Sequence, residues 1–513
     1  MKKCKQIVLM YLYTGISVCH AHCNIEYHTQ YYPTKAGHQY THLEVIVDDN
    51  LPNNPCCQHG PTVLFHRTDQ SHATIEKYYA CTASRDGKCS FKVAASKKST
   101  CYQDASKPAE QLKLDYDEVR NASVSQKVYC IQCQQLFLES NAKDHNKHKL
   151  FDKLSNEILL QPTRFLAPLS MDGNEAQYFF SDSSLNCIEN MLKQVKITKV
   201  ICLGAPRLHE HLLVKTDIKS LLLDIDRRFH WFYDQSQYVS YNMFNHFFFG
   251  GEKAENIFNN YLMVNESTER ICIFTDPPFG CRTELLAHTI SRINQTYNSV
   301  NQLSQQILPT FWIFPYFMET YIQKQMPSME MSDYQVNYTN HRTYHSGEKG
   351  LKHGSPVRIF TNVPLELFKL PVKEGYKWCS ECQKSVHRTN LHCRVCKKCP
   401  SKNGATYRHC SKCNWCVKPN YVHCNACGRC TQVQGHQCSS YRKQLNCRIC
   451  LTKGHMEKCC PFWRTFKHFK MAKSGCVVCG SKQHIVTNCD ERKRVLKERY
   501  FLGQCENAIN CVK

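Results

Sequence analysis

The central part of the chain alternates short apolar runs with stretches of helical periodicity. Between residues 151 and 372, the segments KVICLGAPR, SLLLDID, RICIFTD and TFWIFPYF contain apolar runs of the length expected for buried strands. The segments SSLNCIENMLKQV and LLAHTISRINQTYNSVNQL have apolar positions at helical spacing. Strands that alternate with helices predict an α/β domain with a parallel sheet covered on both faces. Ligands of such sheets bind beyond the carboxyl ends of the strands.

One of these predicted strands ends in Asp276-Pro277-Pro278-Phe279. Two prolines fix φ and remove two amide donors, so the turn is stiff and its carbonyl groups stay available as acceptors. The Asp276 carboxylate and the Pro277 carbonyl can accept the two N–H groups of an exocyclic amine, and Phe279 offers a face on which a base can stack. Such a site aims the lone pair of a planar amine at an electrophilic carbon, with positioning as the main catalytic device.

Motifs of this kind occur in amino-methyltransferases that use S-adenosylmethionine, and two upstream features fit that cofactor. Gly204 follows the run VICL, where a tight turn would approach the cofactor, although this turn has fewer glycines than the usual D-x-G-x-G. The run LLLDID ends in Asp224 and Asp226, of which one could bind the ribose hydroxyls, as acidic residues do in dinucleotide folds. Each feature alone is more often structural, but their order and their positions at strand ends favour a cofactor site.

Charge and cysteine content extend this picture. The formal charge of +23, from 66 Lys and Arg against 43 Asp and Glu, favours nucleic acid as a partner, and a basic surface that serves solubility is the alternative. Of 35 cysteines, 21 lie between Cys379 and Cys511, mostly as C-x2-C interleaved with histidines. This spacing indicates zinc ligation in a reducing compartment rather than disulfides.

The N-terminal segment MKKCKQIVLMYLYTGISVCHA has the basic start and apolar stretch of a secretory signal. Export would oxidise the thiols, so we interpret this segment as a leader or a start-site error. A secretory signal stays an alternative. No other stretch reaches the roughly 18 apolar residues of a membrane span. We therefore expect a soluble intracellular protein that does not bind membranes.

Two zinc fingers are predicted before the central domain. The first resembles the GRF-type finger, a module associated with single-stranded nucleic acid, and Cys56 competes for its first ligand position. The second is a Cys2His2 pattern with two residues between its histidines, where about three to five are usual. Their ligand sets are Cys57, His59, Cys81 and Cys89, and then Cys130, Cys133, His145 and His148.

After the central domain, the block H-C-x2-C-x2-C occurs three times, and each C-x2-C pairs with the next histidine and the cysteine after it. This rule predicts four interlocked sets: Cys379, Cys382, His392 and Cys399; Cys393, Cys396, His409 and Cys416; Cys410, Cys413, His423 and Cys430; Cys424, Cys427, His436 and Cys438. The layout is similar to the cysteine-rich region of DHHC palmitoyltransferases. However, the chain has Arg408-His409-Cys410 instead of the DHHC tetrad, so palmitoyl transfer is not expected.

Two C-x2-C-x4-H-x4-C zinc knuckles follow, and knuckles bind unpaired RNA or DNA. Aromatic and basic residues lie between them, and a solvated helix packed by its aromatics is the alternative for that stretch. With the knuckles, the chain has ligands for about eight zinc ions. The two knuckle sets are Cys447, Cys450, His455 and Cys460, and Cys476, Cys479, His484 and Cys489.

This order of modules resembles the CCHC zinc-finger ribosomal RNA N6-adenosine methyltransferases over about residues 56 to 490, with phrases such as YNMFNHFFF, DPPFG and WIFPYF. The resemblance implies a Rossmann-like class I S-adenosylmethionine-dependent core, methylation of one adenosine in large-subunit ribosomal RNA, and zinc modules that select the RNA and can gate the active site. It also implies nuclear and nucleolar location, with a cytoplasmic fraction and partners such as an RNA helicase or ribosome-assembly factors left open. Cys281 departs from the family where a second glycine would be natural, and the second knuckle could be an addition.

Carried over by position, the resemblance makes Asp276, Pro277, Pro278 and Phe279 the catalytic tetrapeptide. Related RNA adenine methyltransferases imply that Gln177 and Tyr178 flank the cofactor, together with Gly204 and either Asp224 or Asp226.

We divide the chain into six segments. They are a poorly ordered leader (1–50), the GRF-like finger (51–101), the Cys2His2-like finger (102–150), the methyltransferase domain (151–372), the interlocked DHHC-like array (373–440), and the two knuckles with a basic tail (441–513). Two other functions stay open: an amino-methyltransferase that acts on DNA or protein, and a noncatalytic zinc-rich RNA-binding adaptor. The clustered nucleic-acid modules disfavour a protein substrate, and the intact tetrapeptide disfavours an adaptor.

Overall fold

The computed structural model describes residues 30–32, 41–47, 53–68, 74–82, 89, 91–96, 116–169, 177–341, 354–425, 429–433, 436, 483 and 489–490. The chain forms two compact units, each made of three segments. Unit 1 comprises Met1–Leu159, Leu221–Met263 and Gly280–Gln306, and unit 2 comprises Leu160–Ser220, Val264–Phe279 and Ile307–Lys513.

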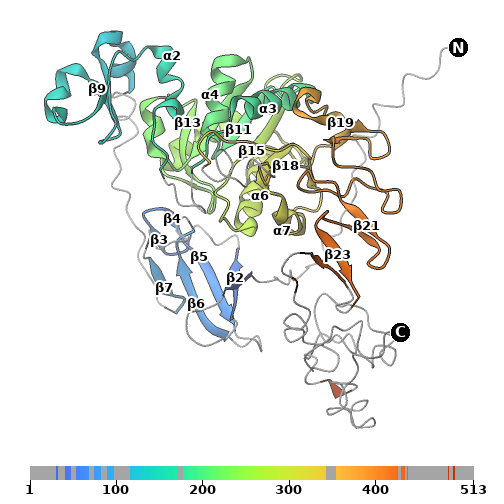
Figure 1. Ribbon diagram of the computed structural model, residues 1–513. Coiled ribbons are helices and arrows are strands. Elements are labelled where there is room, and N and C mark those ends of the chain that lie inside the picture. The colour runs from blue at the N-terminus through green and yellow to red at the C-terminus, as the bar shows by residue number, and fades with distance from the viewer. Residues whose placement is uncertain are drawn as a thin grey trace. The chain divides into compact units, whose positions relative to one another are not determined.

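Unit 1 begins with a small antiparallel sheet, drawn in blue in Figure 1. Its strand order is β1-β2-β5-β6-β7, and a two-stranded ribbon of β3 and β4 accompanies it. Aromatic and β-branched residues favour strands here, and Phe65 stacks on its cross-strand partner Tyr78 with ring centroids 5.5 Å apart. The strands are β1 (Gln30–Tyr32), β2 (Thr41–Ile46), β3 (Cys56–Cys57), β4 (Gly60–Pro61), β5 (Val63–Thr68), β6 (Thr74–Ala80) and β7 (Lys92–Ala94).

A second small sheet in unit 1 has the strand order β10-β8-β9. Its strands are β8 (Lys127–Cys130), β9 (Gln135–Leu138) and β10 (Leu150–Phe151), and the 3-10 helices η2 (Val124–Gln126) and η3 (Glu139–His145) flank them. A short helix, α2 (Asn156–Leu159), follows.

The remaining part of unit 1 belongs to the central domain. Strands β12 (Lys219–Asp224) and β13 (Tyr238–Asn242) are parallel, and β14 (Phe247–Phe248) returns antiparallel to β13. The 3-10 helix η5 (Arg227–Trp231) connects β12 to β13, while α5 (Gly251–Leu262) and α6 (Thr283–Val300) complete the unit. Helix α6 buries residues three or four positions apart, as the periodicity predicts.

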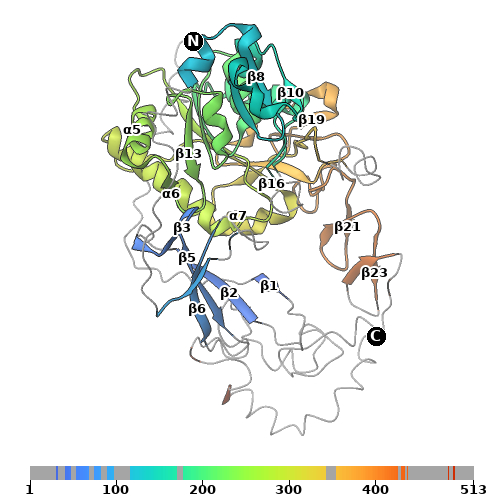
Figure 2. The ribbon, with the colours of Figure 1, turned by 90° about the vertical axis from the view of Figure 1, so that its left-hand side faces the viewer.

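The first small sheet packs on the central domain within unit 1. Val45 and Val63 form a buried cluster with Leu285 of α6, and Figure 2 shows β5 close to this helix. The Asn242 side chain donates a 2.7 Å hydrogen bond to the carbonyl of His59. At the adjacent Gly60, with φ of 91°, any side chain would collide with the ring of Phe247.

In unit 2, five strands of the central domain lie in the order β11-β15-β16-β18-β17. Strands β11, β15 and β16 are parallel, whereas β18 is antiparallel to both of its neighbours. The strands are β11 (Lys199–Leu203), β15 (Ile271–Thr275), β16 (Thr310–Pro315), β17 (Glu330–Met331) and β18 (Val357–Thr361). The helices are α3 (Asp182–Gln194), α4 (Pro206–Lys215) and α7 (Glu319–Gln325), with the 3-10 helices η4 (Pro162–Arg164), η6 (Tyr316–Met318), η7 (Leu365–Leu367) and η8 (Val372–Glu374).

The predicted strands β11, β15 and β16 are parallel as expected, whereas β14, β17 and β18, which were not predicted from the sequence, pair antiparallel with their neighbours. Strand β18 is buried along its whole length, as strands of parallel sheets are, although its sequence VRIFT includes Arg358 and Thr361. An apolar run does not encode strand direction, which depends on the connection. The described residues between β17 and β18 form no crossover helix, and the two strands pair antiparallel.

The described residues of the C-terminal part of unit 2 include three hairpins, drawn in orange in Figure 1. The hairpins are β19 (Tyr376–Cys379) with β20 (Lys384–His387), β21 (Arg408–Cys410) with β22 (Trp415–Val417), and β23 (Tyr421–Cys424) with β24 (Arg429–Gln432). In the first two hairpins, a C-x2-C segment forms the turn.

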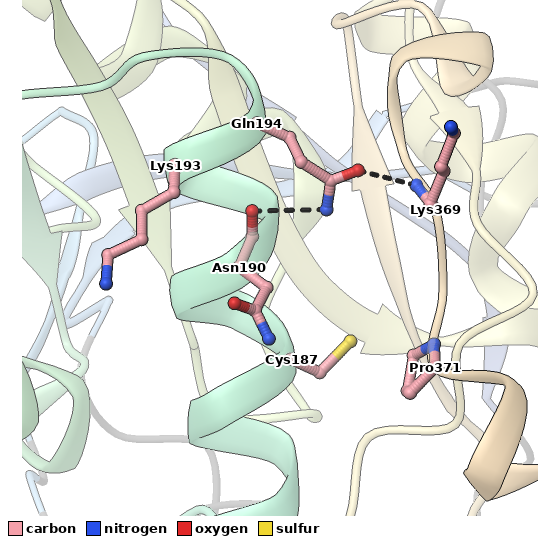
Figure 3. Close-up of a pocket in the computed structure, with 6 residues that line it drawn as sticks. All are labelled: Cys187, Asn190, Lys193, Gln194, Lys369 and Pro371. Carbon is pink, nitrogen blue, oxygen red and sulfur yellow. Dashed lines mark hydrogen bonds between the residues drawn. The ribbon is translucent and has the colours of Figure 1, made fainter.

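Unit 2 also has a shallow depression of about 370 Å³ between α3 and residues 369–371. Gln194 joins its two walls, because its side-chain oxygen accepts a 2.7 Å hydrogen bond from the Lys369 amide. Figure 3 shows the ammonium groups of Lys193 and Lys369 pointing in different directions, so these charges do not converge on a common ligand. In the described part of the chain, no helix has the length and apolar character needed to cross a membrane.

Candidate active site and metal centres

Asp276 lies at the carboxyl end of the parallel strands in unit 2. It follows β15 directly, and its amide donates a 3.2 Å hydrogen bond to the carbonyl of Leu203, the last residue of β11. Thr275 and Leu203 are partners in the parallel register. Asp276 and Gly204 therefore emerge at the same edge of the sheet, where α/β domains bind ligands.

The carboxyl group of Asp276 has a specific partner. The hydroxyl of Tyr338 donates a 2.9 Å hydrogen bond to Oδ1 of Asp276. Burial raises the pKa of Asp276 well above its ordinary value, although this hydrogen bond opposes the shift. A protonated carboxyl group is a poorer acceptor for an amine, so the amine-binding form is lost at a higher pH than for an exposed aspartate.

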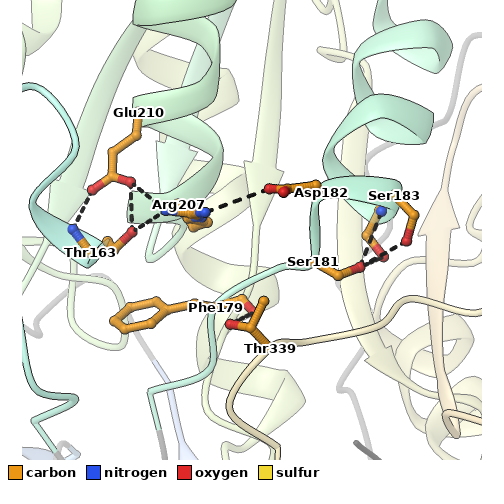
Figure 4. Close-up of polar contacts among 9 residues, drawn as sticks. Thr163, Phe179, Ser181, Asp182, Ser183, Arg207, Glu210 and Thr339 are labelled. Atoms are coloured by element: carbon orange, nitrogen blue, oxygen red, sulfur yellow. Dashed lines mark hydrogen bonds and ion pairs between the residues drawn. The ribbon is translucent and has the colours of Figure 1, made fainter. Parts of the chain in front are cut away.

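Two segments that are far apart in sequence pair beside Asp276. Phe180 and Tyr338 form an antiparallel bridge, and the Thr339 amide donates a 2.8 Å hydrogen bond to the Phe179 carbonyl. The side chain of Asn340 closes the pairing, because it accepts from the Phe179 amide at 2.8 Å and donates to the Gln177 carbonyl at 2.9 Å. Figure 4 shows Phe179 against Thr339. This pairing fixes residues 177–180 next to Tyr338.

The pairing produces a cluster of aromatic rings around the predicted tetrapeptide. The ring of Tyr178 lies 5.6 Å from Phe279, 5.5 Å from Tyr338 and 4.4 Å from His341, with which it stacks. Phe279 also lies 6.1 Å from Phe314, the penultimate residue of β16. Tyr178 and Phe279 are partly exposed, so neither ring is fully enclosed by the protein. The structure thus brings together Tyr178, Phe279 and Asp276.

Gly204 has the conformation that a tight strand-to-helix turn requires. Its φ is 65°, in the left-handed region that disfavours side chains, and α4 begins two residues later at Pro206. This β-turn-α arrangement fits a nucleotide-like cofactor at the end of β11.

A buried polar network holds α4 in place behind this turn. The backbone amide and the hydroxyl of Thr163 both donate to the Glu210 carboxylate at 2.6 Å, and Arg207 pairs with Glu210 and with Asp182 of α3 (Figure 4). Burial raises the pKa of Glu210 to about 7. The network ties η4, α4 and α3 together and so supports the segment that starts at Gly204.

The two aspartates at the end of β12, in unit 1, have different surroundings. Asp226 is 1% exposed and makes a two-point ion pair with Arg228, with Nε–Oδ1 and Nη2–Oδ2 distances of 2.8 and 2.6 Å. Asp224 instead accepts a 2.9 Å hydrogen bond from the Asp226 amide, and burial raises its pKa to about 7. Arg228 thus neutralises Asp226 directly, which favours Asp224 as the carboxylate that receives a cofactor hydroxyl.

The structure gathers five of the predicted ligand sets into compact groups. Within each group the candidate ligand atoms all lie within 4.8 Å of one another, and their Cys and His donors suit zinc. Cys57 belongs to the first group, whereas the Cys56 thiol donates to the Asn54 carbonyl. The groups are Cys57, His59, Cys81 and Cys89; Cys130, Cys133, His145 and His148; Cys379, Cys382, His392 and Cys399; Cys393, Cys396, His409 and Cys416; and Cys410, Cys413, His423 and Cys430.

The backbone of these groups also fits a bound cation. The amide of Cys133 donates to the Cys130 sulfur at 3.3 Å, and the amide of Cys396 donates to the Cys393 sulfur at 3.4 Å, which stabilises thiolates. The residue after the second cysteine of four C-x2-C segments has a positive φ, a conformation that costs free energy unless the turn is held. These residues are Gln134, Gln383, Lys397 and Asn414.

Three predicted ligand sets extend beyond the described residues. The fourth set of the array includes Cys427 and Cys438, and the first knuckle lies wholly outside the described part. Of the second knuckle, Cys489 is described and its predicted partners are not. The described cysteines form no disulfide.

Comparisons with known proteins decide the family. Residues 171–362 match a family model described as "Probable N6-adenine methyltransferase". The rRNA N(6)-adenosine-methyltransferase ZCCHC4 of Homo sapiens is 38% identical over 384 residues, which cover 71% of this chain and 74% of the relative. The proteins of the same name from Xenopus laevis and Mus musculus are 36% and 38% identical, covering 70% of this chain and 77% and 73% of the relatives. The chain belongs to the ZCCHC4 family of rRNA N(6)-adenosine-methyltransferases. The resemblance seen in the motifs is thereby confirmed.

The part of this ZCCHC4 family member that matches the methyltransferase model contains every predicted catalytic and cofactor residue. Tyr338, Asn340 and His341 also lie in it, but the sequence analysis missed them. The segment VNYTNH has neither strand alternation nor a ligand spacing, and its importance depends on pairing with residues 177–180. An aromatic and amide-rich segment downstream of the tetrapeptide was the available signal, and it is too common to be specific.

Proposed function

We propose that this protein transfers a methyl group from S-adenosylmethionine to the N6 amine of an adenosine in large-subunit ribosomal RNA. The observation that carries the proposal is the Asp276 carboxyl group, held by Tyr338 at the carboxyl end of β15 beside the rings of Phe279 and Tyr178. Membership of the ZCCHC4 family supports ribosomal RNA as the substrate.

The strand arrangement supports a Rossmann-like class I core as its framework. Strand β11 has β15 as a parallel neighbour, although β12, β13 and β14 come between them in sequence. The chain therefore leaves β11, forms the strands of unit 1 and then returns as β15 to pair with β11. This is the connectivity that creates a ligand site at a topological switch point.

Three residues of the tetrapeptide would have a defined role toward the adenine. Because Tyr338 donates to Oδ1 of Asp276, Oδ2 remains for one N–H of the N6 amine, and the Pro277 carbonyl takes the other. Phe279 would stack on the base, which must be unpaired to reach it. S-adenosylmethionine supplies the electrophilic methyl group, and the chain supplies orientation.

The same proposal assigns the cofactor residues. The turn at Gly204 would approach the cofactor backbone, and Asp224 would accept the ribose hydroxyls. Gln177 and Tyr178 would flank the cofactor, and the Gln177 side-chain oxygen already accepts a 3.0 Å hydrogen bond from the Leu169 amide. Asp226 stays a weaker candidate because Arg228 occupies its carboxylate.

The metal groups are proposed to bind zinc, about eight ions in the whole chain, and to select the RNA. Exposed aromatic side chains next to the ligands support nucleic-acid contact, since Trp378 and Trp415 are 46% and 50% exposed beside Cys379 and Cys416. The net charge of +23 supports a polyanionic substrate.

The domain limits and the location are part of the proposal. We propose a leader (1–50), a GRF-like finger (51–101), a Cys2His2-like finger (102–150), the methyltransferase domain (151–372), the zinc array (373–440) and the knuckles with their tail (441–513). A ribosomal RNA substrate would place the protein in the nucleus and nucleolus, with a cytoplasmic fraction and helicase or ribosome-assembly partners as further predictions.

The substrate class is tested by methyl transfer in vitro. Purified full-length protein with labelled S-adenosylmethionine should methylate large-subunit ribosomal RNA, and should methylate duplex DNA and total protein at least about tenfold more slowly. Faster labelling of DNA or protein would favour those amino-methyltransferase functions, and binding of RNA without any transfer would favour the adaptor.

Replacement of Tyr338 by Phe tests the orientation of Asp276. Tyr338→Phe keeps the ring contacts with Phe180 and Tyr178 but removes the donor to Oδ1. We expect kcat to fall about tenfold with little change in KM for RNA, because a hydrogen bond to a charged group contributes about 1.5–3 kcal/mol. The expected acid limb of the pH–rate profile also moves to higher pH, since this bond lowers the pKa of Asp276. An unchanged kcat and profile would exclude this role.

A further inference from the structure

A series of hydrogen bonds connects the second metal finger, which is the group of Cys130, Cys133, His145 and His148, to the end of β12 within unit 1. The side-chain oxygen of Gln134 accepts a 3.0 Å hydrogen bond from Nη1 of Arg228. Arg228 donates through Nε and Nη2 to both oxygens of Asp226. The amide of Asp226 donates to Oδ1 of Asp224 at 2.9 Å. Three side chains thus lie between a cysteine turn and the carboxylate proposed to bind the cofactor ribose.

The position of Gln134, where this series of hydrogen bonds starts, depends on the geometry of the second metal finger. Gln134 directly follows Cys133 and has φ of 54°, in the left-handed region that a glutamine rarely adopts. The turn that imposes this conformation is closed by the bond from the Cys133 amide to the Cys130 sulfur. The direction of the Gln134 side chain therefore depends on the gathering of the four ligands.

The other end of the hydrogen-bond series, at Asp226 and Arg228, is buried and charged. Asp226 and Arg228 are 1% and 9% exposed, so their ion pair is largely removed from water. Such a pair is stable only when its remaining donors also find partners, and Gln134 accepts one of them. Tyr129 of β8 adds an apolar contact, with its ring 6.1 Å from that of Phe232 after η5. The finger thus meets the loop through both a polar and an apolar contact.

We propose that Gln134 and Arg228 are positioning residues for the cofactor, through which the second metal finger holds the Asp224 loop in its binding conformation. The affinity for S-adenosylmethionine would then depend on a finger that lies outside the region matched by the methyltransferase family model. The inference rests on the proposed function, because it assumes that Asp224 binds the ribose hydroxyls. It gives this finger a role in cofactor binding in addition to any contact with RNA.

Two substitutions and one matched control test the inference in the full-length protein. Gln134→Leu keeps the size of the side chain and removes the acceptor. Arg228→Lys keeps the charge but has one donor nitrogen, where Arg228 uses three to reach both Asp226 oxygens and Gln134. The control is Gln132→Leu in the same turn, because the Gln132 oxygen accepts from the Lys149 amide inside the finger. The Kd of S-adenosylmethionine and of S-adenosylhomocysteine is measured by calorimetry without RNA, and KM for cofactor, KM for RNA and kcat are measured separately.

Loss of a hydrogen bond to a charged group predicts a cofactor Kd about fivefold to tenfold higher for Gln134→Leu, and more than about tenfold higher for Arg228→Lys. We expect the cofactor Kd of Gln132→Leu to match the wild type within about twofold, and the KM for RNA to stay unchanged in all three variants. A metal analysis of each variant identifies any loss of zinc. If Gln134→Leu loses zinc, the cofactor Kd of Arg228→Lys tests the inference instead, because Arg228 is not adjacent to a metal ligand.

The outcomes separate this inference from the proposed function. A wild-type cofactor Kd in both Gln134→Leu and Arg228→Lys would overturn the inference and leave the proposed function intact. A raised KM for RNA with an unchanged cofactor Kd would also overturn it, because it would assign Gln134 to RNA contact. A wild-type protein that does not bind S-adenosylmethionine would overturn both.

Discussion

Replacement of Asp276 by Ala should reduce methyl transfer to ribosomal RNA at least about a hundredfold while RNA binding and folding persist. In the proposed site this carboxylate accepts the N6 amine, and loss of one preorganised polar group in an active site costs about a hundredfold to a thousandfold in kcat. The measurement is single-turnover transfer of a labelled methyl group, with RNA affinity and thermal unfolding as controls. Undiminished transfer by Asp276→Ala would contradict the site assignment.

Replacement of Asp276 by Asn keeps a side-chain acceptor but removes the negative charge. Asp276→Asn keeps a side-chain oxygen for the N6 amine but cannot titrate, so we expect partial activity, between the wild type and Asp276→Ala. In the wild type, kcat/KM should fall as the pH drops through the raised pKa of Asp276, because the acceptor form is lost. The Asn variant should lack this acid limb. An identical limb in both proteins would place the titrating group elsewhere.

The raised pKa of Asp276 also predicts how this residue changes the stability of the fold with pH. The folded protein binds the Asp276 proton more tightly than the unfolded chain, so the contribution of this group to stability falls as the pH rises from its ordinary value of 3.8 to its raised value. At neutral pH this group therefore contributes less to the stability of the fold than it does at pH 3.8, and Asp276→Asn should unfold at the same or a higher temperature than the wild type. A clear decrease in Tm for Asp276→Asn would show that burial of the charge is compensated.

Removal of a ligand from the zinc array should have the largest effect on stability. Cys396 belongs to the second set of the array, and its C-x2-C segment lies between His392 and Cys399, which are ligands of the first set. Loss of a structural zinc removes about 10–16 kcal/mol of apparent binding free energy. We expect Cys396→Ser to lose one or two of about eight zinc ions per chain, as counted by mass spectrometry of the metal and of the native protein.

Val395 provides the matched control for this experiment. It lies in the same turn, is 66% exposed and is not a ligand, so Val395→Ser should keep the wild-type metal content. An unchanged zinc count in Cys396→Ser would remove Cys396 from the ligand set. A wild-type count near two would contradict the interlocked array as a whole.

The metal groups could be predicted from the sequence to a greater extent than the active site. Ligands of small zinc modules follow local spacing rules, so counting from Cys379 to Cys430 was enough to predict the three sets that the structure gathers in the array. Cys57 and Cys56 were not separable by spacing, and the hydrogen bond from Cys56 to the Asn54 carbonyl distinguishes them.

Active-site residues that depend on tertiary contacts were beyond sequence reasoning. Tyr338 reaches Asp276 across 62 positions, and the pairing of two irregular segments sets that contact. Asp224, the last residue of β12, and Asp226 look equivalent in the run LLLDID, and only the position of Arg228 distinguishes them. The apolar runs of β11, β12, β15 and β16 predicted the strands, but they contained no information about the antiparallel direction of β18.

Nucleoside mass spectrometry of large-subunit ribosomal RNA is the most direct test of the central claim. RNA from cells that lack this protein is compared with RNA from the same cells after re-expression of the wild type or of Asp276→Ala. We predict that N6-methyladenosine decreases in the absence of the protein, returns with the wild type and does not return with Asp276→Ala. An unchanged level of N6-methyladenosine in ribosomal RNA from cells without the protein would contradict the proposed function.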